Sequence, residues 1–230
     1  MLIHSDFSKP VILDSDQYDW VPSPQHGVER VMLDRIGVEK ARATSIVRYA
    51  KSSSFPSHQH PQGEEILVLS GTFSEQGVDY PAGWYLRNPD GTSHQPSSLD
   101  GTTIFVKLRQ MSQADNQSVR INTNLDEAWY TTSPDAKDGV YEYCPLFQND
   151  NEKVELRKLC NKQIINTFSN VLTEILVLAG MVKVNDQLIT KNGWIRLPKG
   201  SENQIVVQED QTKIYLKTMK TITNLESENI

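Results

Sequence analysis

A long internal repeat constrains this chain more than any other feature. The segment EILVLSG at residues 65–71 recurs as EILVLAG at residues 174–180, and GWYLRNPDGTSH at residues 83–94 recurs loosely as GWIRLPKGSEN at residues 193–203. The period is near 109 residues, far longer than the unit of a solenoid, so it predicts two tandem copies of one domain.

The two copies are predicted to meet in a polar linker. The stretch SQADNQSVRINTN at residues 112–124 is rich in Ser, Asn and Gln and has no apolar run. We therefore expect a first domain over residues 1–112 and a second over residues 113–230.

Each copy is predicted to be all-β. Short runs of β-branched and aromatic residues alternate with Gly, Pro and Asp-Gly turn signals, and no stretch has sustained helical periodicity. Many short strands at near-regular spacing are typical of a sandwich or a barrel. The ILVL segment in both copies is apolar on both faces, which predicts a strand that is covered on both sides.

Composition and charge exclude several function classes. The net charge is −6 and the lysines and arginines are scattered, so no nucleic-acid partner is expected. No apolar run approaches the ~18 residues of a membrane span, and the first residues lack the pattern of a secretory signal. Cys144 and Cys160 are the only cysteines and form no CxxC pair. A soluble cytoplasmic protein without a membrane partner is the expectation.

The stretch SHQHPQGEE at residues 57–65 places metal-ligand residue types close together, in what is predicted to be a buried strand. Residues two apart in a strand point the same way, so His58 and His60 face one side, and a Pro-Gln-Gly turn brings Glu64 back within reach. His94 follows on a later predicted strand. Three imidazoles and a carboxylate that converge inside a barrel suit a divalent metal, and burying them unpaired would be costly.

Each of these residues has an ordinary alternative. An isolated HxH pair is more often exposed surface, a single glutamate is more often solvated, and a single histidine is more often hydrogen-bonded in a core or loop. The combined spacing, in which HxH is followed by Glu and then by G-x5-P-x-G-x2-H, favours the metal site. Mixed nitrogen and oxygen ligands suit zinc, iron, manganese and nickel alike.

HQHPQGEEILVLSG and GWYLRNPDGTSH resemble the two motifs of the cupin superfamily. The GEE-x-LVL-x-G run, the YPAGWYLRNPDGTSHQP run and the opening W-x-PSP-x-x-GV are similar to the ChrR-like cupins, named for the C-terminal domain of the zinc-containing anti-sigma factor ChrR. The resemblance covers residues 20–110 well and residues 129–219 as a decayed copy. It implies two tandem jelly-roll β-barrels, with the same three histidines and glutamate as ligands of one divalent ion. Zinc is the first choice, and iron, manganese or nickel are the alternatives.

The second copy lacks the ligand types. The corresponding positions hold Thr167, Ser169, Thr173 and Asn203, whereas scaffold residues such as Trp194 recur. We therefore predict a degenerate second barrel and one ion per chain, bound in the first copy. The histidines are then not needed for a barrel of this kind to fold.

A few other side chains carry weaker predictions. Glu65 follows the ligand glutamate in the strand and is expected to point away from the metal. Tyr49 and Phe105 are candidate pocket residues, but aromatic residues in strands belong more often to the core, and core packing is the preferred interpretation. Arg87 is a candidate anion ligand, although a solvated or salt-bridged arginine is the preferred interpretation. The family has a glycine where this chain has Ser52, which predicts a turn there.

Two main functions remain open at this point. As an enzyme, the chain would use a metal with open positions to bind a small-molecule ligand and perform dioxygenase or other oxidoreductase chemistry. As a relative of ChrR, it would instead be a sensory or regulatory module. It lacks the N-terminal sigma-binding helices and the His/Cys zinc motif of those proteins, so a sigma-factor partner is not expected. Metal storage is disfavoured, because a single site gives little capacity. The two barrels are expected to pack as an intramolecular pseudo-dimer, with a homodimer as a further possibility.

Overall fold

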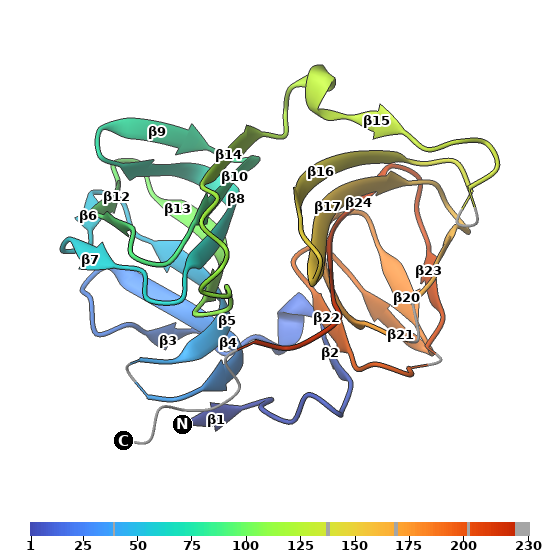
Figure 1. Ribbon diagram of the computed structural model, residues 1–230, viewed down its shortest axis with the longest axis horizontal. Coiled ribbons are helices and arrows are strands. Elements are labelled where there is room, and N and C mark those ends of the chain that lie inside the picture. The colour runs from blue at the N-terminus through green and yellow to red at the C-terminus, as the bar shows by residue number, and fades with distance from the viewer. Residues whose placement is uncertain (39, 137–138, 168–169, 202, 224–230) are drawn as a thin grey trace. The chain divides into compact units, whose positions relative to one another are not determined.

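The computed structural model describes residues 1–38, 40–136, 139–167, 170–201 and 203–223. Nearly all of the regular secondary structure in the described chain is β-strand, as predicted (Figure 1). Its helices are two single 3-10 turns, η1 (Ser15–Gln17) and η2 (Asp126–Ala128). Among the described residues no helix has the length and apolar character needed to cross a membrane.

Contacts between residues divide the chain into two compact units. The first unit consists of Met1–Ser5, Asp19–Asn124 and the chain from Thr223 on, and the second consists of Asp6–Tyr18 and Leu125–Ile222. Each unit is therefore built from more than one stretch of sequence. The domain division expected after residue 112 stays a prediction.

The first unit is built on one antiparallel sheet whose main order is β1–β4–β5–β13–β8–β10–β14. In that order the strands span Leu2–Ile3, Val28–Ile36, Arg42–Tyr49, Thr102–Leu108, Glu64–Glu75, Trp84–Asn88 and Val119–Asn122. Strand β3 (Val21–Pro22) pairs with β4, β9 (Val78–Pro81) pairs with β8, and β12 (Pro96–Ser98) pairs with β6 (Ser53–Ser54) and β8. A separate ladder joins β7 (His58–Gln59) to β11 (Ser93–His94).

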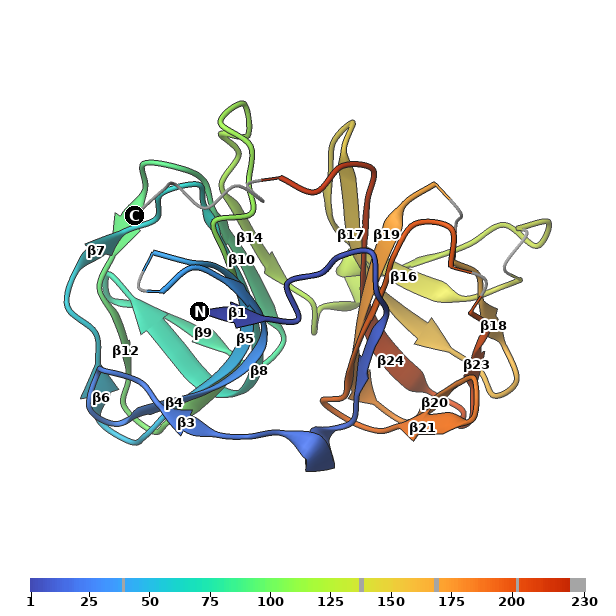
Figure 2. The same cartoon turned by 90° about the horizontal axis from the view of Figure 1, so that it is seen from below.

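The second unit repeats this plan with two sheets. The larger has the order β15–β16–β17–β24–β19–β22–β2. Its strands span Tyr130–Thr131, Glu142–Gln148, Glu152–Leu159, Thr212–Met219, Leu172–Ala179, Trp194–Leu197 and Val11–Leu13. The smaller sheet is β18 (Ile164–Ile165), β23 (Ile205–Val207), β20 (Val182–Val184) and β21 (Gln187–Ile189). Figure 2 shows how the two sheets of this unit curve towards each other around an interior.

The strand register shows that the two units are copies. In the first unit Glu65 of β8 lies opposite Lys107 of β13. In the second unit Glu174 of β19 lies opposite Lys217 of β24. The strands β5, β13 and β8 therefore correspond to β17, β24 and β19, and the repeat found in the sequence is a repeat of structure.

The predicted linker at residues 112–124 is wrong in its second half. Residues 119–122 form β14, which pairs with β10 so that Val119 lies opposite Arg87. The equivalent strand β2 pairs with β22, where Val11 lies opposite Arg196. The sequence VRIN does not look like a core strand because β14 is an edge strand, and an edge strand does not need two apolar faces.

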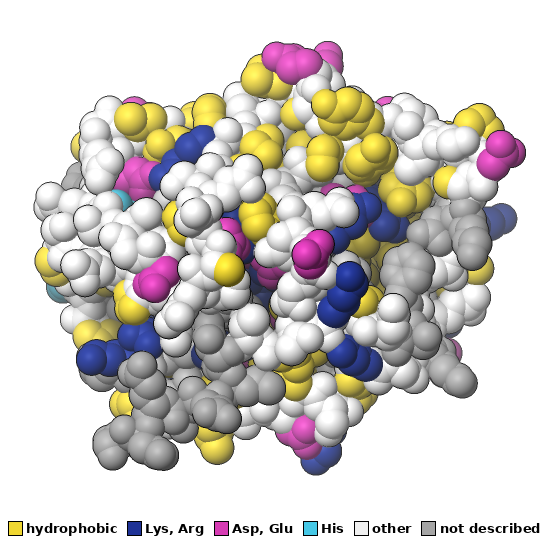
Figure 3. Space-filling view, viewed as in Figure 1, with side chains coloured by type: hydrophobic (Ala, Val, Ile, Leu, Met, Phe, Trp, Pro, Cys, Tyr) yellow, Lys and Arg dark blue, Asp and Glu magenta, His cyan; other side chains and the backbone are white. Residues whose placement is uncertain are grey.

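Each unit has its own apolar core inside its curved sheets. The core of the first unit includes Tyr49, Phe73 and Ile104. The core of the second unit is aliphatic and includes Ile175 and Ile195. On the face drawn in Figure 3, basic and acidic side chains lie in small separate groups among polar and apolar ones.

Candidate metal centre

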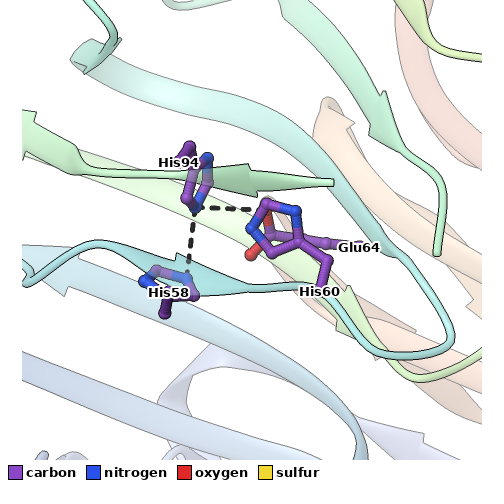
Figure 4. Close-up of side chains that lie close together, drawn as sticks. All are labelled: His58, His60, Glu64 and His94. Carbon is purple, nitrogen blue, oxygen red and sulfur yellow. Dashed lines mark hydrogen bonds and ion pairs between the residues drawn. The ribbon is translucent and has the colours of Figure 1, made fainter. Parts of the chain in front are cut away.

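The structure brings the four predicted ligands together in the first unit. One donor atom from each of His58, His60, Glu64 and His94 lies within 4.8 Å of the donors of the others. Figure 4 shows the three imidazole rings and the carboxylate pointing towards one another. Three of the four residues are buried, and His58 is exposed. The expectation of a buried strand is therefore wrong for His58, because β7 lies at the edge of a two-stranded ladder.

A tight turn and a short ladder position these side chains. In β7 and β11, His58 lies directly opposite His94. The backbone N–H of Gly63 donates to the carbonyl of His60 at 3.0 Å, which closes the predicted turn. Gly63 has a φ of +76°, and a Cβ there would lie 2.3 Å from the sulfur of Met111, so this position requires glycine. The turn delivers Glu64 to the start of β8, with its side chain facing the histidines.

The distances between donors match a shared ion. His94 Nε2 lies 3.2 Å from His58 Nε2 and 3.5 Å from Glu64 Oε2, and His60 Nε2 lies 3.4 Å from that same oxygen. Bonds of about 2.0–2.2 Å to one ion place neighbouring donors about 3 Å apart at a right angle and about 3.4 Å apart at the tetrahedral angle. The observed spacings of 3.2, 3.4 and 3.5 Å lie close to the tetrahedral value and above the right-angle value.

Hydrogen bonds to Nδ1 fix the orientation of all three rings. His58 Nδ1 contacts the carbonyl of Pro56 at 3.0 Å, and a carbonyl accepts only. His60 Nδ1 lies 2.9 Å from the hydroxyl of Thr92, which itself donates to the carbonyl of Pro89. His94 Nδ1 contacts the carboxylate of Glu75. Each ring therefore carries its proton on Nδ1 and turns the lone pair of Nε2 inwards, as metal-binding histidines do.

This arrangement suits a cation at its centre. With both protons on Nδ1, the facing lone pairs of His58 and His94 repel each other. His60 Nε2 is buried and has no hydrogen-bond partner. Burial lowers the pKa of His60, although the charge of Glu64 acts in the opposite direction, so its ring is held in the neutral form that binds metals. The donor set fits a divalent metal ion.

A second layer of polar residues supports the ligands, and the sequence analysis missed it. Glu75, at the end of β8, contacts His94 and accepts a bond of 2.7 Å from Arg120. Arg120 also bonds Asn88 Oδ1 at 2.6 Å, and Asn88 Nδ2 donates to Glu64 at 3.1 Å. Burial alone would raise the pKa of Glu75, but its bonds with His94 and Arg120 outweigh burial and lower it. Glu75 is therefore a charged acceptor that holds the ring of His94.

A cavity of about 620 Å³ lies beside the cluster in the first unit. All four candidate ligands contribute to its lining, together with apolar side chains such as Val47 and Val106. Tyr49 lines the cavity and also belongs to the apolar core, whereas Phe105 does not line the cavity. Ile104 and Val106 line it instead, so Phe105, which lies between them on β13, faces the other way.

The remaining predicted residues lie on that other face of the sheet. Glu65 is buried and lies 3.4 Å from Arg87, away from the metal cluster as expected. Arg87 is fully buried and also pairs with Asp115. The salt-bridged alternative for Arg87 is confirmed, and the solvated alternative is wrong because the side chain is fully buried. Ser52 has a φ of 58°, a left-handed conformation that explains the glycine of related sequences.

The second unit holds no comparable cluster among the residues that the structure describes. Thr173 lies opposite Leu197 of β22, as Glu64 lies opposite Asn88 of β10, so it occupies the position of the ligand glutamate. Thr167 donates to the carbonyls of Ser201 and Asn203, at 3.2 and 3.4 Å. The remaining counterpart, Ser169, lies outside the described residues.

Comparisons with known proteins agree with this architecture. A family model described as the ChrR cupin-like domain matches residues 8–112. No curated protein matches the sequence. Among solved structures, a candidate dioxygenase from Nostoc punctiforme is similar with a TM-score of 0.69 at 14% identity, over 100% of this chain and 87% of the other.

Two further solved structures have the same fold. The bacterial pirin YhhW from Escherichia coli, solved in complex with nickel(II), has a TM-score of 0.66 at 13% identity, over 92% of this chain and 99% of its own. A cupin 2 conserved barrel domain protein from Leptotrichia buccalis has a TM-score of 0.58 at 13% identity, over 93% and 97%. At these identities the likeness establishes the fold alone. The chain has the fold of two tandem cupin domains, the second without the ligand cluster among its described residues, and residues 8–112 match the model of the ChrR cupin-like domain.

Proposed function

We propose that the first unit is a metal-dependent oxygenase of the dioxygenase type that acts on a small molecule. The observation that carries this proposal is that the four ligands form part of the wall of a cavity of about 620 Å³. A structural metal site is closed by its protein ligands, whereas a catalytic site keeps a position open towards a substrate pocket. Cytoplasmic location and the absence of nucleic-acid or membrane partners belong to the same proposal.

His58, His60, Glu64 and His94 would hold one divalent ion. When bound, an ion such as Fe(II) supplies Lewis acidity and one-electron chemistry with O2. Zinc is favoured by the resemblance to ChrR, and manganese and nickel suit the same donors. The identity of the metal is part of the proposal, not of the structure.

The surrounding side chains have their own roles. Val47, Ile104 and Val106 give the cavity an apolar wall, which excludes water and favours a substrate with a carbon skeleton. Burial, reinforced by the charge of Glu64, raises the pKa of Tyr49. Its hydroxyl therefore stays protonated at neutral pH and offers a hydrogen bond to a substrate oxygen.

A sensory role is the second candidate, and the ChrR cupin-like match over residues 8–112 is the observation that favours it. In that case the ion would be zinc, closed by the same four donors, and displacement or oxidation of the site would be the signal.

The two functions are separated by loading the protein anaerobically with Fe(II) and measuring O2 consumption. The substrates are a panel of β-diketones, thiols and small phenols, and the His94→Ala variant is the matched blank. We expect turnover with at least one class of substrate and none with the variant. If iron, manganese and nickel all give no turnover, and zinc binds with no exchangeable water, the sensory role replaces the enzyme.

A further inference from the structure

The cavity beside the metal cluster has a strongly cationic lining. Among its described lining residues are four cationic side chains and a single carboxylate, Glu64, which already belongs to the ligand set. The cationic residues are Arg30, Arg35, Lys40 and Arg109. A divalent ion would add to this charge. The described lining residues therefore carry an excess of positive charge, which attracts anions.

A β-bulge turns two of these arginines to the same side of β4. Arg30 and Arg35 are five residues apart, so on a regular strand they would point to opposite faces. The pairing of β4 with β5 skips Leu33, which is the extra residue of the bulge. Arg35 consequently faces the cavity, while Asp34 faces the other side, 3.8 Å from Arg42.

One donor atom of Arg30 has no acceptor. Its Nε is buried without a hydrogen-bond partner, and no carboxylate pairs with its guanidinium among the residues that the structure describes. A buried donor of this kind is costly unless a bound group satisfies it. Arg35 is only 5% exposed and donates to the carbonyl of Val38. In the strand register Arg35 pairs with Ala43, Ala43 with Leu108, and Leu108 with Glu64. Arg35 and the candidate ligand Glu64 therefore lie in the same row of residues across the sheet.

The second unit supplies an internal comparison. It has the same bulge, between Pro145 and Phe147 of β16, where the pairing with β17 shifts. The register gives Tyr143 and Gln148 as the counterparts of Arg30 and Arg35. The second unit therefore has neither the arginine pair nor the ligand cluster among its described residues. It does have the β-bulge that, in the first unit, turns Arg35 towards the cavity.

We propose that the cavity binds a small organic acid, whose carboxylate pairs with Arg30 and Arg35 while a chelating group at its other end reaches the metal. This inference names the substrate class of the function proposed above and rests on it. Guanidinium groups bind carboxylates through charge-assisted hydrogen bonds. The apolar wall between the two polar ends suits a short carbon chain.

The test uses succinylacetone, a β-diketone with a terminal carboxylate, against its methyl ester, which keeps the chelating group but not the charge. Binding of each to metal-loaded and metal-free protein is measured by calorimetry. We expect the acid to bind the wild-type protein at least about tenfold more tightly than the ester, as one charge-assisted contact implies. This comparison needs no variant, so it stands even if a substitution prevents folding.

Variants then locate the contact. Arg30→Gln is the cleaner of the two, because Arg35 also holds the carbonyl of Val38. We expect Arg30→Gln and Arg35→Gln each to remove most of the preference for the acid, with the affinity for the ester and the metal content unchanged. Arg48→Gln is the matched control, since Arg48 lies on the neighbouring strand β5, is exposed and pairs with Glu29 at 2.5 Å.

Equal binding of acid and ester by the wild-type protein would overturn the inference, as would a preference that survives both cavity variants. Displacement of the acid by chloride or phosphate as readily as by propionate would show an unspecific anion site and would also overturn it. If instead the proposal of a metal site is wrong, the experiment gives a different result. In that case the protein binds no metal and no ester, and the preference for the acid is read from the metal-free protein alone.

Discussion

The interior of the first unit holds three histidines, a glutamate and a cavity, whereas the interior of the second is filled by aliphatic side chains. In the second unit Ile175, Val184 and Ile205 are completely buried in one continuous core. Both interiors are framed by strands in the same order and register. The same arrangement of strands, called the common frame below, therefore folds with either a polar cluster or an aliphatic core inside it. The candidate ligands are not what makes the fold stable.

On the face of each sheet that points away from the interior, the two copies share a set of buried charged residues. There the two copies keep the same buried charges at equivalent positions, Glu65, Arg87 and Lys107 in the first and Glu174, Arg196 and Lys217 in the second. Residues that recur in both copies belong to the fold, and residues found in one copy belong to its function. The predictions below test this division.

Removing a ligand should have the largest effect. His60→Ala deletes a buried Nε2 donor and should lower the bound metal from about one ion per chain to less than about a tenth, because three remaining donors hold such an ion poorly. Thr173→Ala, at the position equivalent to Glu64, is the control and should keep the full ion. Metal analysis after dialysis measures both. Loss of metal from the Thr173 variant would mean that the second unit takes part.

Neutralising a shared buried charge should act on stability and not on metal. Glu65→Gln and Glu174→Gln each remove a buried negative charge that lies opposite a buried arginine and a buried lysine on the neighbouring strands. We expect both to lower the free energy of unfolding by about 3 kcal/mol. Denaturant unfolding measures the loss. The two variants should keep one ion per chain as long as they remain folded. A large effect at Glu65 with none at Glu174 would contradict their assignment to the common frame.

Substitutions in the layer of polar residues that supports the ligands should reduce metal affinity less than removal of a ligand does. Glu75→Gln and Arg120→Gln disturb the acceptor that orients His94, and we expect each to weaken metal binding by about 10- to 100-fold. Competition with a chelator gives the affinity. Arg48→Gln, on an exposed side chain, is the control. Unchanged affinity in both variants would remove Glu75 and Arg120 from the metal centre.

Relieving a shared backbone strain should have the smallest effect. Ser52 and its counterpart Lys162 have φ values of 58° and 68°, a region that favours glycine. Ser52→Gly and Lys162→Gly should therefore each stabilise the chain by about 1 kcal/mol. Thermal unfolding would detect this. Neither change should alter metal binding, and destabilisation by both would show that other contacts of these side chains matter more than the backbone.

The sequence was sufficient for the frame and for the clustering of the four candidate ligands because both depend on local patterns. The spacing of His58 and His60 gave their common direction, and the glycine turn explained how Glu64 reaches them. The loss of ligands from the second copy was visible because the repeat aligned the positions. The fold class followed from short strands between turn signals and from the family resemblance.

The supporting layer escaped sequence reasoning because it depends on long-range pairing. Arg120 reaches Glu75 only because β14 adds to the edge of β10, and nothing in the polar sequence around it predicts that pairing. Similarly, the direction of Arg35 depends on the bulge at Leu33, which a strictly alternating pattern does not reveal. The alignment of β14 with β2 across the repeat was the one signal that would have identified the strand.

The central claim is that one ion binds in the first unit through four named donors and none in the second. Anomalous diffraction at the absorption edge of the bound metal, from crystals of metal-loaded protein, tests this most directly. We predict one peak per chain, within bonding distance of Nε2 of His58, His60 and His94 and of the Glu64 carboxylate. A peak inside the second unit, or an ion held by other residues, would contradict the account.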